Sequence, residues 1–189
     1  MRILVTGGAG FIGSHLVRSL TAAGGHEVLN IDLLTHAGSK QTLADLESHP
    51  KHRLLQADIG DAEAMRQAFT DFQPEQIIHL AAESHVDRSI DAPQRFMETN
   101  VMGTFVLLQE ARHYLEQNKD ARASFRFLHV STDEVYGSVS ASDAFRESTA
   151  YDPHSPYSAS KASADHLVRA WHHTYGMPIL ITHSSNNYG

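Results

Sequence analysis

The chain has 189 residues, of which 41% are hydrophobic and 20% are charged, as expected for one globular domain with a sizeable core. The 15 Lys and Arg against 22 Asp and Glu give a net charge of −7 without a basic patch, which argues against a nucleic-acid partner. Cysteine is absent and the 14 histidines lack zinc-ligand spacing, so we expect no metal site. The first apolar run is too short for a signal sequence or a membrane span, so we expect a cytoplasmic protein with no membrane contact.

Short β-branched runs alternate with longer amphipathic stretches along the chain, a pattern typical of parallel βαβ units. The expected strands are Arg2–Thr6, Glu27–Ile31, Arg53–Ala57, Gln76–Leu80, Phe125–Ser131 and Pro178–Thr182. The expected helices are Phe11–Ala23, Leu43–Ser48, Ala62–Phe72 with Asp61 as its cap, Pro93 to about Gln117, and Ser155–Thr174. Because crossovers between parallel strands are right-handed, this order predicts an α/β fold with a doubly wound parallel sheet, a Rossmann fold of strand order 3-2-1-4-5-6. We expect residues 1–189 to form one NAD-binding domain.

A glycine-rich turn joins the first strand to the first helix. Gly7, Gly10 and Gly13 are spaced as GxxGxxG, which lets backbone N–H groups approach a pyrophosphate at a helix N-terminus. Asp32 ends the second strand, where a carboxylate accepts hydrogen bonds from a ribose diol and repels a 2′-phosphate. The pattern therefore favours NAD over NADP, although glycines also serve ordinary turns. Asp58, at the end of the third strand, is expected either to hold the adenine edge or to cap a helix.

Tyr157 and Lys161 are separated by one helical turn near the start of the last long helix. Tyrosine is a poor base at neutral pH, and both the nearby ammonium and the helix N-terminus are expected to lower its pKa. Such a pair is common by chance, so the glycine loop and the Ser-Thr pair at the end of the fifth strand are what give it significance. The adjacent Asp133 and Glu134 are interpreted as a second acid and base. The alternative is that they form a solvated acidic turn or cap a local turn.

In this context the chain resembles the extended short-chain dehydrogenase/reductase superfamily and, more narrowly, the dTDP-glucose 4,6-dehydratases. Four segments carry the resemblance: His79–Ser89, Ser131–Gly137, Tyr157–Arg169 and Ser185–Gly189. Sugar-nucleotide epimerases share the glycine loop and the Tyr/Lys pair but usually lack the Asp-Glu pair. The resemblance implies a dTDP-sugar substrate and NAD as the cofactor.

The family mechanism assigns roles to five residues of this chain. Tyr157, activated by Lys161, takes the proton of the glucose 4-hydroxyl while hydride leaves C4 for NAD, and Thr132 holds that oxygen. Glu134 then removes the C5 proton, and Asp133 protonates the departing 6-hydroxyl. Hydride returns to C6, so the product is dTDP-4-keto-6-deoxyglucose.

The resemblance also implies binding positions for the cofactor and the substrate. The cofactor positions are Gly7, Gly10, Phe11, Ile12, Gly13, Asp32, Asp58, Ile59, Leu80, Ala81, Ala82, Thr99, Tyr157 and Lys161. The substrate positions are Ser84, Thr132 and Asn186. Asn100 is expected to have a structural role. The two long helices are expected to form a homodimer, with Phe96, Val101, Phe105 and Leu108 belonging either to that face or to the core.

The chain also departs from the family pattern. Related dehydratases continue past the last segment into a C-terminal lobe that grips the nucleotide, so the activity of this chain alone and the nucleobase of its substrate stay open. Leu33, His36, His183 and Ser184 replace the usual residues, which leaves their effect on cofactor contact open. Two alternatives follow: a sugar-nucleotide epimerase or other hexose dehydratase, and a non-catalytic NAD-binding remnant.

Overall fold

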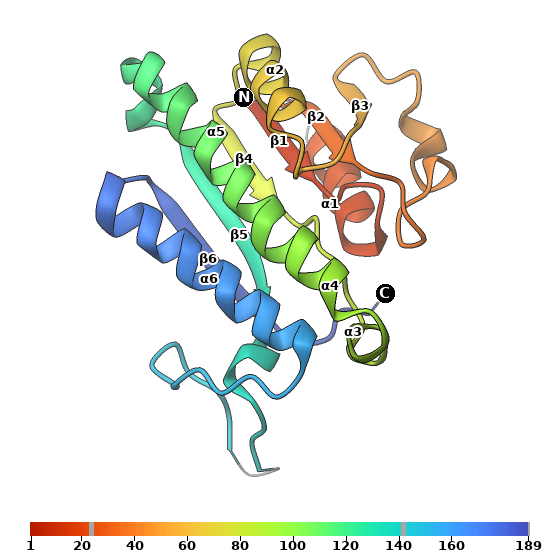
Figure 1. The fold of residues 1–189 in the computed structure, drawn as a ribbon. Helices are drawn as coiled ribbons and strands as arrows, with labels where there is room; N and C mark the ends of the chain where they lie inside the picture. The colour runs from red at the N-terminus through yellow and green to blue at the C-terminus, as the bar shows by residue number, and fades with distance from the viewer. Residues whose placement is uncertain (23–24, 141–142, 189) are drawn as a thin grey trace.

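A parallel sheet of six strands forms the centre of the computed structural model, which describes residues 1–22, 25–140 and 143–188 (Figure 1). The strands lie in the order β3-β2-β1-β4-β5-β6, which confirms the predicted Rossmann topology. Their bounds are β1 Arg2–Thr6, β2 Glu27–Asp32, β3 His52–Gln56, β4 Gln76–His79, β5 Arg126–Thr132 and β6 Ile179–Ser184. The carboxyl ends of all six strands therefore lie at one edge of the sheet.

Helices cover both faces of the sheet. Their bounds are α1 Phe11–Ala22, α2 Ala62–Phe72, α3 Val86–Asp91, α4 Pro93–Phe96, α5 Thr104–Gln117 and α6 Pro156–Tyr175. Shorter helical turns are η1 Lys40–Leu46, η2 Met97–Gly103, η3 Lys119–Ala123 and η4 Asp133–Tyr136. Figure 1 shows α5 and α6 running side by side along one face, and the contacts place α2 beside α5 on that face.

The alternation of side chains along the strands builds two apolar layers. Leu4 of β1 belongs to the larger layer, which includes residues of α2, α5 and α6. Ile3 and Val5 belong to the second layer, which includes Val17 of α1 and Leu43 of η1. Strands buried on both faces are typical of parallel sheets, and this explains why their sequences are continuously apolar.

The helical segments differ from the predictions in three places. The expected helix from Pro93 to Gln117 is divided, because a π-helical segment, η2, separates α4 from α5. The helix α3 was not expected, and η1 is a 3-10 helix that begins at Lys40, where Ser39 caps it. Single π-helical turns are frequent at functional sites, and η2 contributes Thr99 to the cavity described below. Ala23, the expected end of the first helix, lies outside the described residues.

Side-chain caps fix the starts of the helices near the cavity. Asp61 accepts hydrogen bonds from the backbone of Glu63 and Ala64, so its predicted cap on α2 is confirmed. Ser155 and Ser158 form a capping box at the start of α6. This box fixes the first turn of α6, which carries Tyr157.

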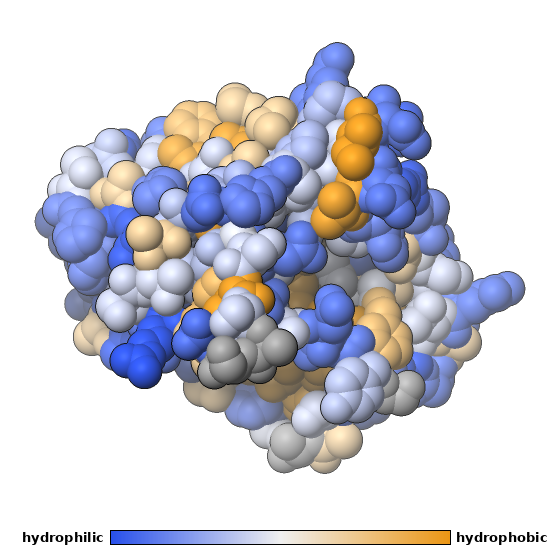
Figure 2. Space-filling model, turned by 90° about the horizontal axis from the view of Figure 1, so that it is seen from below, coloured by the Kyte–Doolittle hydropathy of each residue, from blue (hydrophilic) through white to orange (hydrophobic). Residues whose placement is uncertain are grey.

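The edge at which the strands end is shown from below in Figure 2. The surface on this side is mostly hydrophilic, with a few separate apolar patches. Phe11 and Ile12, at the start of α1, are 53% and 43% exposed. Within the described part of the chain, no helix is both long and apolar enough to cross a membrane.

Candidate functional site

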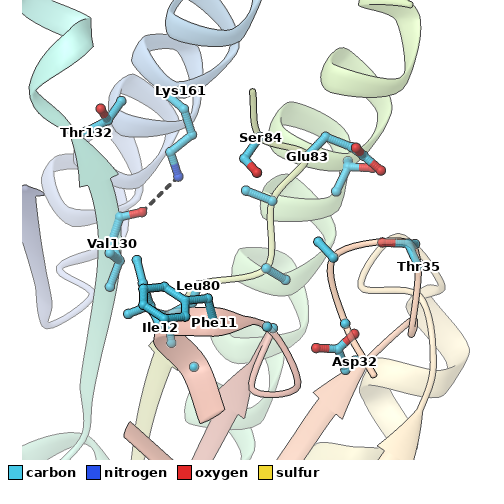
Figure 3. A pocket seen from close by; sticks show the side chains of 18 of the residues that line it. Phe11, Ile12, Asp32, Thr35, Leu80, Glu83, Ser84, Val130, Thr132 and Lys161 are labelled. Carbon is cyan, nitrogen blue, oxygen red and sulfur yellow. Dashed lines mark hydrogen bonds between the residues drawn. The ribbon is translucent and has the colours of Figure 1, made fainter. Parts of the chain in front are cut away.

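A cavity of about 510 Å³ opens at the carboxyl ends of the strands. Its wall combines the loop after β1, the ends of β2, β4 and β5, and the first turns of α6. In Figure 3, Lys161 and Thr132 lie on one side and Asp32 on the other, with Phe11 and Leu80 between them. The volume is in the range of small-molecule sites, and its position at the strand ends is where open α/β sheets bind ligands.

The glycine loop is packed too tightly for a side chain at two of the three glycines of the GxxGxxG motif, Gly7 and Gly13. Gly7 has a φ of +74°, and a Cβ there would lie 2.6 Å from the backbone nitrogen of Ala81. A Cβ on Gly13 would lie 2.2 Å from the carbonyl oxygen of Gly7. All three glycines line the cavity, but Gly10 is different in that a Cβ there would have its nearest neighbour 3.4 Å away. The first and third glycines therefore permit close packing, and the second leaves backbone open to a ligand.

Asp32 is fixed at the end of β2 by two backbone hydrogen bonds. Its Oδ2 accepts from the N–H of Ala9 at 2.9 Å, and its Oδ1 accepts from the N–H of Leu34 at 2.8 Å. Each carboxylate oxygen has a further lone pair for a ligand hydroxyl. Asp32 also lines the cavity, so the oriented carboxylate is available to a diol.

The next acidic residue, Asp58, forms a local turn in which its Oδ1 accepts from the N–H of Gly60 at 2.8 Å. The helix-cap alternative for Asp58 is wrong, because Asp61 occupies the cap position of α2. Asp58 and Ile59 both line the cavity. Their position leaves the adenine-edge interpretation as a prediction.

Tyr157 and Lys161 project from the first two turns of α6 into the cavity. Lys161 is 4% exposed, and its ammonium donates a hydrogen bond of 2.8 Å to the carbonyl oxygen of Val130 on β5 (Figure 3). Burial lowers the pKa of Lys161 to about 8. The side chain is therefore charged at neutral pH, at the inner end of the cavity.

The expected lowering of the Tyr157 pKa is not found. Burial raises the pKa of Tyr157, and the charge of Glu134 raises it further, while the interaction with the Thr132 hydroxyl acts in the opposite direction. The lysine donates its hydrogen bond to Val130 rather than to the phenol oxygen. Desolvation and the neighbouring carboxylates therefore set the direction of the Tyr157 pKa shift.

The two adjacent carboxyl groups after β5 do not share the cavity. Thr132 caps the 3-10 turn η4 by accepting a hydrogen bond from the N–H of Glu134 at 3.2 Å, and both residues line the cavity. Burial raises the pKa of Glu134, and the charge of Asp133 adds to this. Asp133 is not a wall residue, and its Oδ1 accepts from the Thr132 hydroxyl at 3.4 Å. Successive residues of a 3-10 turn point about 120° apart, which explains the separation.

Asn100, on η2, connects the loop after β4 to α6. Its Oδ1 accepts from the N–H of Glu83 at 2.8 Å, and its Nδ2 donates to the Glu83 carbonyl at 3.0 Å and to Ser160 Oγ at 2.8 Å. These contacts agree with the structural role expected for it. The substrate candidates Ser84 and Asn186 line the cavity.

The predicted positions and the cavity wall overlap closely. Every predicted cofactor and substrate residue lines the cavity, and so does every predicted catalytic residue except Asp133. The wall also contains residues that were not predicted as binding positions: Ile31, Thr35, Ala37, Gly38, Ala57, Glu83, His85, Val130, Ser131, Ser185 and Asn187, together with Leu33 and Ser184, which the sequence had indicated only as departures from the family pattern. Most of them neighbour predicted residues at strand ends, which is the signal that could have identified them.

The four departures from the family pattern divide into two groups. Leu33 and Ser184 line the cavity, whereas His36 and His183 are not wall residues. His183 instead packs against the rings of Tyr136 and Tyr151. Among the described residues, no group of three or more His, Asp or Glu side chains is arranged to hold a metal ion.

Comparison with known proteins identifies close relatives. A family model described as GDP-mannose 4,6 dehydratase matches residues 4–189. The chain is 53% identical to dTDP-glucose 4,6-dehydratase 1 of Escherichia coli strain K12 and 56% identical to a probable dTDP-glucose 4,6-dehydratase of Sinorhizobium fredii. All of this chain is covered in both comparisons, but only 55% and 54% of those proteins. The chain therefore spans about half the length of the curated relatives that it matches.

Solved structures resemble the chain along its whole length. DesIV, a dTDP-glucose 4,6-dehydratase from Streptomyces venezuelae with NAD and TYD bound, superposes with a TM-score of 0.90 at 48% identity. That comparison covers 100% of this chain and 57% of DesIV. A UDP-glucose 4-epimerase from Thermotoga maritima superposes with a TM-score of 0.87 at 32% identity, again covering 57% of the longer chain.

Proposed function

The chain belongs to the GDP-mannose 4,6-dehydratase family, and from that premise we propose that it is the NAD-binding, catalytic part of a dTDP-glucose 4,6-dehydratase. The observation that carries the proposal is that Glu134 shares one cavity with Tyr157 and Lys161. Dehydration needs a base for a carbon-bound proton in addition to the residues of alcohol oxidation. The dTDP-glucose enzymes among the relatives favour dTDP-glucose over GDP-mannose as the substrate.

The residues fit NAD. Only glycine is compatible with the packing at Gly7 and Gly13, while Gly10 leaves the backbone accessible, as a pyrophosphate requires. Asp32 is oriented toward the cavity and disfavours a 2′-phosphate, so NAD is favoured over NADP. Bound NAD supplies the hydride acceptor at C4 and the hydride donor at C6.

The first proton transfer belongs to Tyr157. Its phenol oxygen takes the proton of the 4-hydroxyl, and the neighbouring Lys161 ammonium stabilises the phenolate form. The hydroxyl of Thr132 holds the same substrate oxygen. Burial raises the pKa of Tyr157, so forming the phenolate depends on the charge of Lys161. That charge acts more strongly on the phenolate when substrate and cofactor exclude water from the cavity.

The elimination belongs to the acidic pair. Glu134 removes the C5 proton, which the 4-keto group has made acidic, and its raised pKa suits a base that must later return the proton. We assign protonation of the departing 6-hydroxyl to Asp133. This role requires the Asp133 side chain to turn from Thr132 toward the cavity when substrate binds.

The domain organisation, the oligomeric state and the location of the protein are also part of the proposal. We treat residues 1–189 as one NAD-binding domain and infer a homodimer that forms through α5 and α6. Phe105 of α5 packs edge-to-face on Trp171 of α6 with ring centroids 5.8 Å apart, and nearby Met102 is 54% exposed, so apolar side chains remain open on this side. Phe96 and Leu108 are buried in the core and do not contribute to that face. The cytoplasmic location remains a prediction.

The proposal is tested by incubating the chain with NAD and dTDP-glucose and following the 4-keto-6-deoxy product. Product formation supports the dehydratase, and a C4 epimer without loss of water supports the epimerase alternative. NAD binding without any reaction would refute an active enzyme and favour a non-catalytic NAD-binding remnant. A Glu134→Gln variant serves as the control, because it retains the Tyr157 and Lys161 pair while losing the base.

A further inference from the structure

Asp165 lies on α6 one turn beyond Lys161, is fully buried, and does not belong to the cavity wall. Its Oδ2 accepts three hydrogen bonds from three different parts of the chain. Ser131 of β5 donates at 2.9 Å, Tyr151 of the segment before α6 at 3.1 Å, and His183 of β6 at 3.0 Å. A buried carboxylate with this many donors connects α6 to two strands at once.

The second oxygen of Asp165 faces β5. Nε2 of His129 lies 3.2 Å from Oδ1. Burial lowers the pKa of His129 to about 4, with a further contribution from the charge of Lys161, so His129 is neutral at neutral pH and the contact is not an ion pair. Burial alone would raise the pKa of Asp165, but its interactions with His129, His183 and Ser131 outweigh this and hold the pKa well below its usual range. Asp165 is therefore a fixed negative charge beside the Lys161 side chain.

Deepening the proposed function, on which this step rests, we infer that Asp165 is a positioning residue of the active site. Its carboxylate fixes α6, which carries Tyr157 and Lys161, against the strand end that carries Thr132, and its charge balances the buried ammonium. The dehydratase thus uses a third carboxylate, one that does not contact the reacting atoms.

The anchoring follows from where the donors lie. Ser131 immediately precedes Thr132 on β5, so the hydrogen bond from Ser131 to Asp165 ties the helix to the strand next to a proposed catalytic residue. The buried apolar residues of α6 next to Asp165 are Ala162 and Ala164, whose side chains are short, and the larger Val168 lies one turn further along the helix. Directional hydrogen bonds from buried groups determine register more strongly than such packing does.

The charge of Asp165 shifts the pKa values of Tyr157 and Lys161 in the same direction. The charge of Asp165 raises the pKa of Lys161 and also that of Tyr157, although burial is the larger influence on each. Removing the charge therefore lowers both pKa values. The titratable and charged groups around these three residues are His79, His129, Asp133, Glu134, Tyr136, Tyr151, Arg169 and His183.

The test is an ultraviolet titration of tyrosinate in the full 189-residue chain, with and without NAD. Subtracting the curve of a Tyr157→Phe variant isolates the contribution of Tyr157, and the same subtraction is made in an Asp165→Asn background. We expect the midpoint to move to lower pH when Asp165 is replaced. An unchanged midpoint, or a move to higher pH, would overturn the charge effect. The amide preserves the shape of the carboxylate, and circular dichroism establishes that the variant folds.

A second variant separates anchoring from charge and keeps the inference testable if Asp165→Asn does not fold. Tyr151→Phe combined with His183→Leu removes two donors that are not cavity-wall residues and leaves the carboxylate charged. We expect NAD affinity to fall about tenfold, as for the loss of two hydrogen bonds, with no change in the Tyr157 midpoint. Wild-type affinity in this variant would overturn the anchoring role. Neither readout needs turnover, so a failure of the proposed dehydratase activity is distinguished from a failure of this inference.

Discussion

Replacing Asn100 with alanine is expected to destabilise the protein far more than an ordinary change of one side chain. Asn100 is 1% exposed and makes three side-chain hydrogen bonds, two to the backbone of Glu83 and one to Ser160. Each bond contributes about 1 kcal/mol, and a buried group left without its partner costs roughly 1–3 kcal/mol. The free energy of unfolding should therefore fall by about 3–5 kcal/mol.

The measurement is urea unfolding followed by circular dichroism. Asn118→Ala is the matched control, because the Asn118 side chain makes one hydrogen bond, 2.9 Å long, to the Tyr114 carbonyl. The control should lose about 1 kcal/mol. If Asn100→Ala lost no more stability than Asn118→Ala, the Asn100 amide would not be what holds η2, the loop after β4 and α6 together.

Four further results are expected. Gly7→Ala should abolish measurable NAD binding by calorimetry, because of the positive φ and the 2.6 Å approach to Ala81, and retained affinity would contradict the tight turn. Asp32→Ala should reduce the preference for NAD over NADP by about tenfold or more, whereas unchanged discrimination would remove Asp32 from the ribose site. Glu134→Gln should stop product formation yet allow some reduction of NAD. Because the pKa of Glu134 is raised, the wild-type rate should begin to fall at a higher pH than it would with a glutamate of ordinary pKa as the base. The ammonium of Lys161 is lost as the pH rises through about 8, so activity should decline above that pH, and a Lys161→Arg variant should not show this decline.

The fold could be predicted because its signals are local. The β1 range Arg2–Thr6 and the α2 range Ala62–Phe72 were predicted residue for residue from apolar periodicity and a cap. The division at η2 was not predictable in this way. Thr99, Asn100, Val101 and Gly103 are poor helix formers, but neither propensity nor apolar periodicity distinguishes a π-helical turn from an α-helical one. Asn100 in this segment contacts the distant Glu83 and Ser160, and such contacts are invisible to sequence periodicity.

The site shows the same contrast. Motif spacing was sufficient to bring the glycine loop, Tyr157 and Lys161 to one cavity, because the carboxyl ends of parallel strands meet. It could not separate Asp133 from Glu134, since the direction of each side chain depends on the 3-10 turn that follows β5. The pKa of Tyr157 was wrongly expected to fall, because its burial becomes visible only when α6 is packed on the sheet.

In the proposed function, one cavity oxidises C4, eliminates water and returns the hydride to C6. The most direct test is to supply the chain with NAD and dTDP-glucose that carries deuterium at C4, and to locate the label in the product by nuclear magnetic resonance. We expect a 4-keto-6-deoxy product with the deuterium at C6. Product with only solvent hydrogen at C6, or substrate returned without dehydration, would contradict the proposed function.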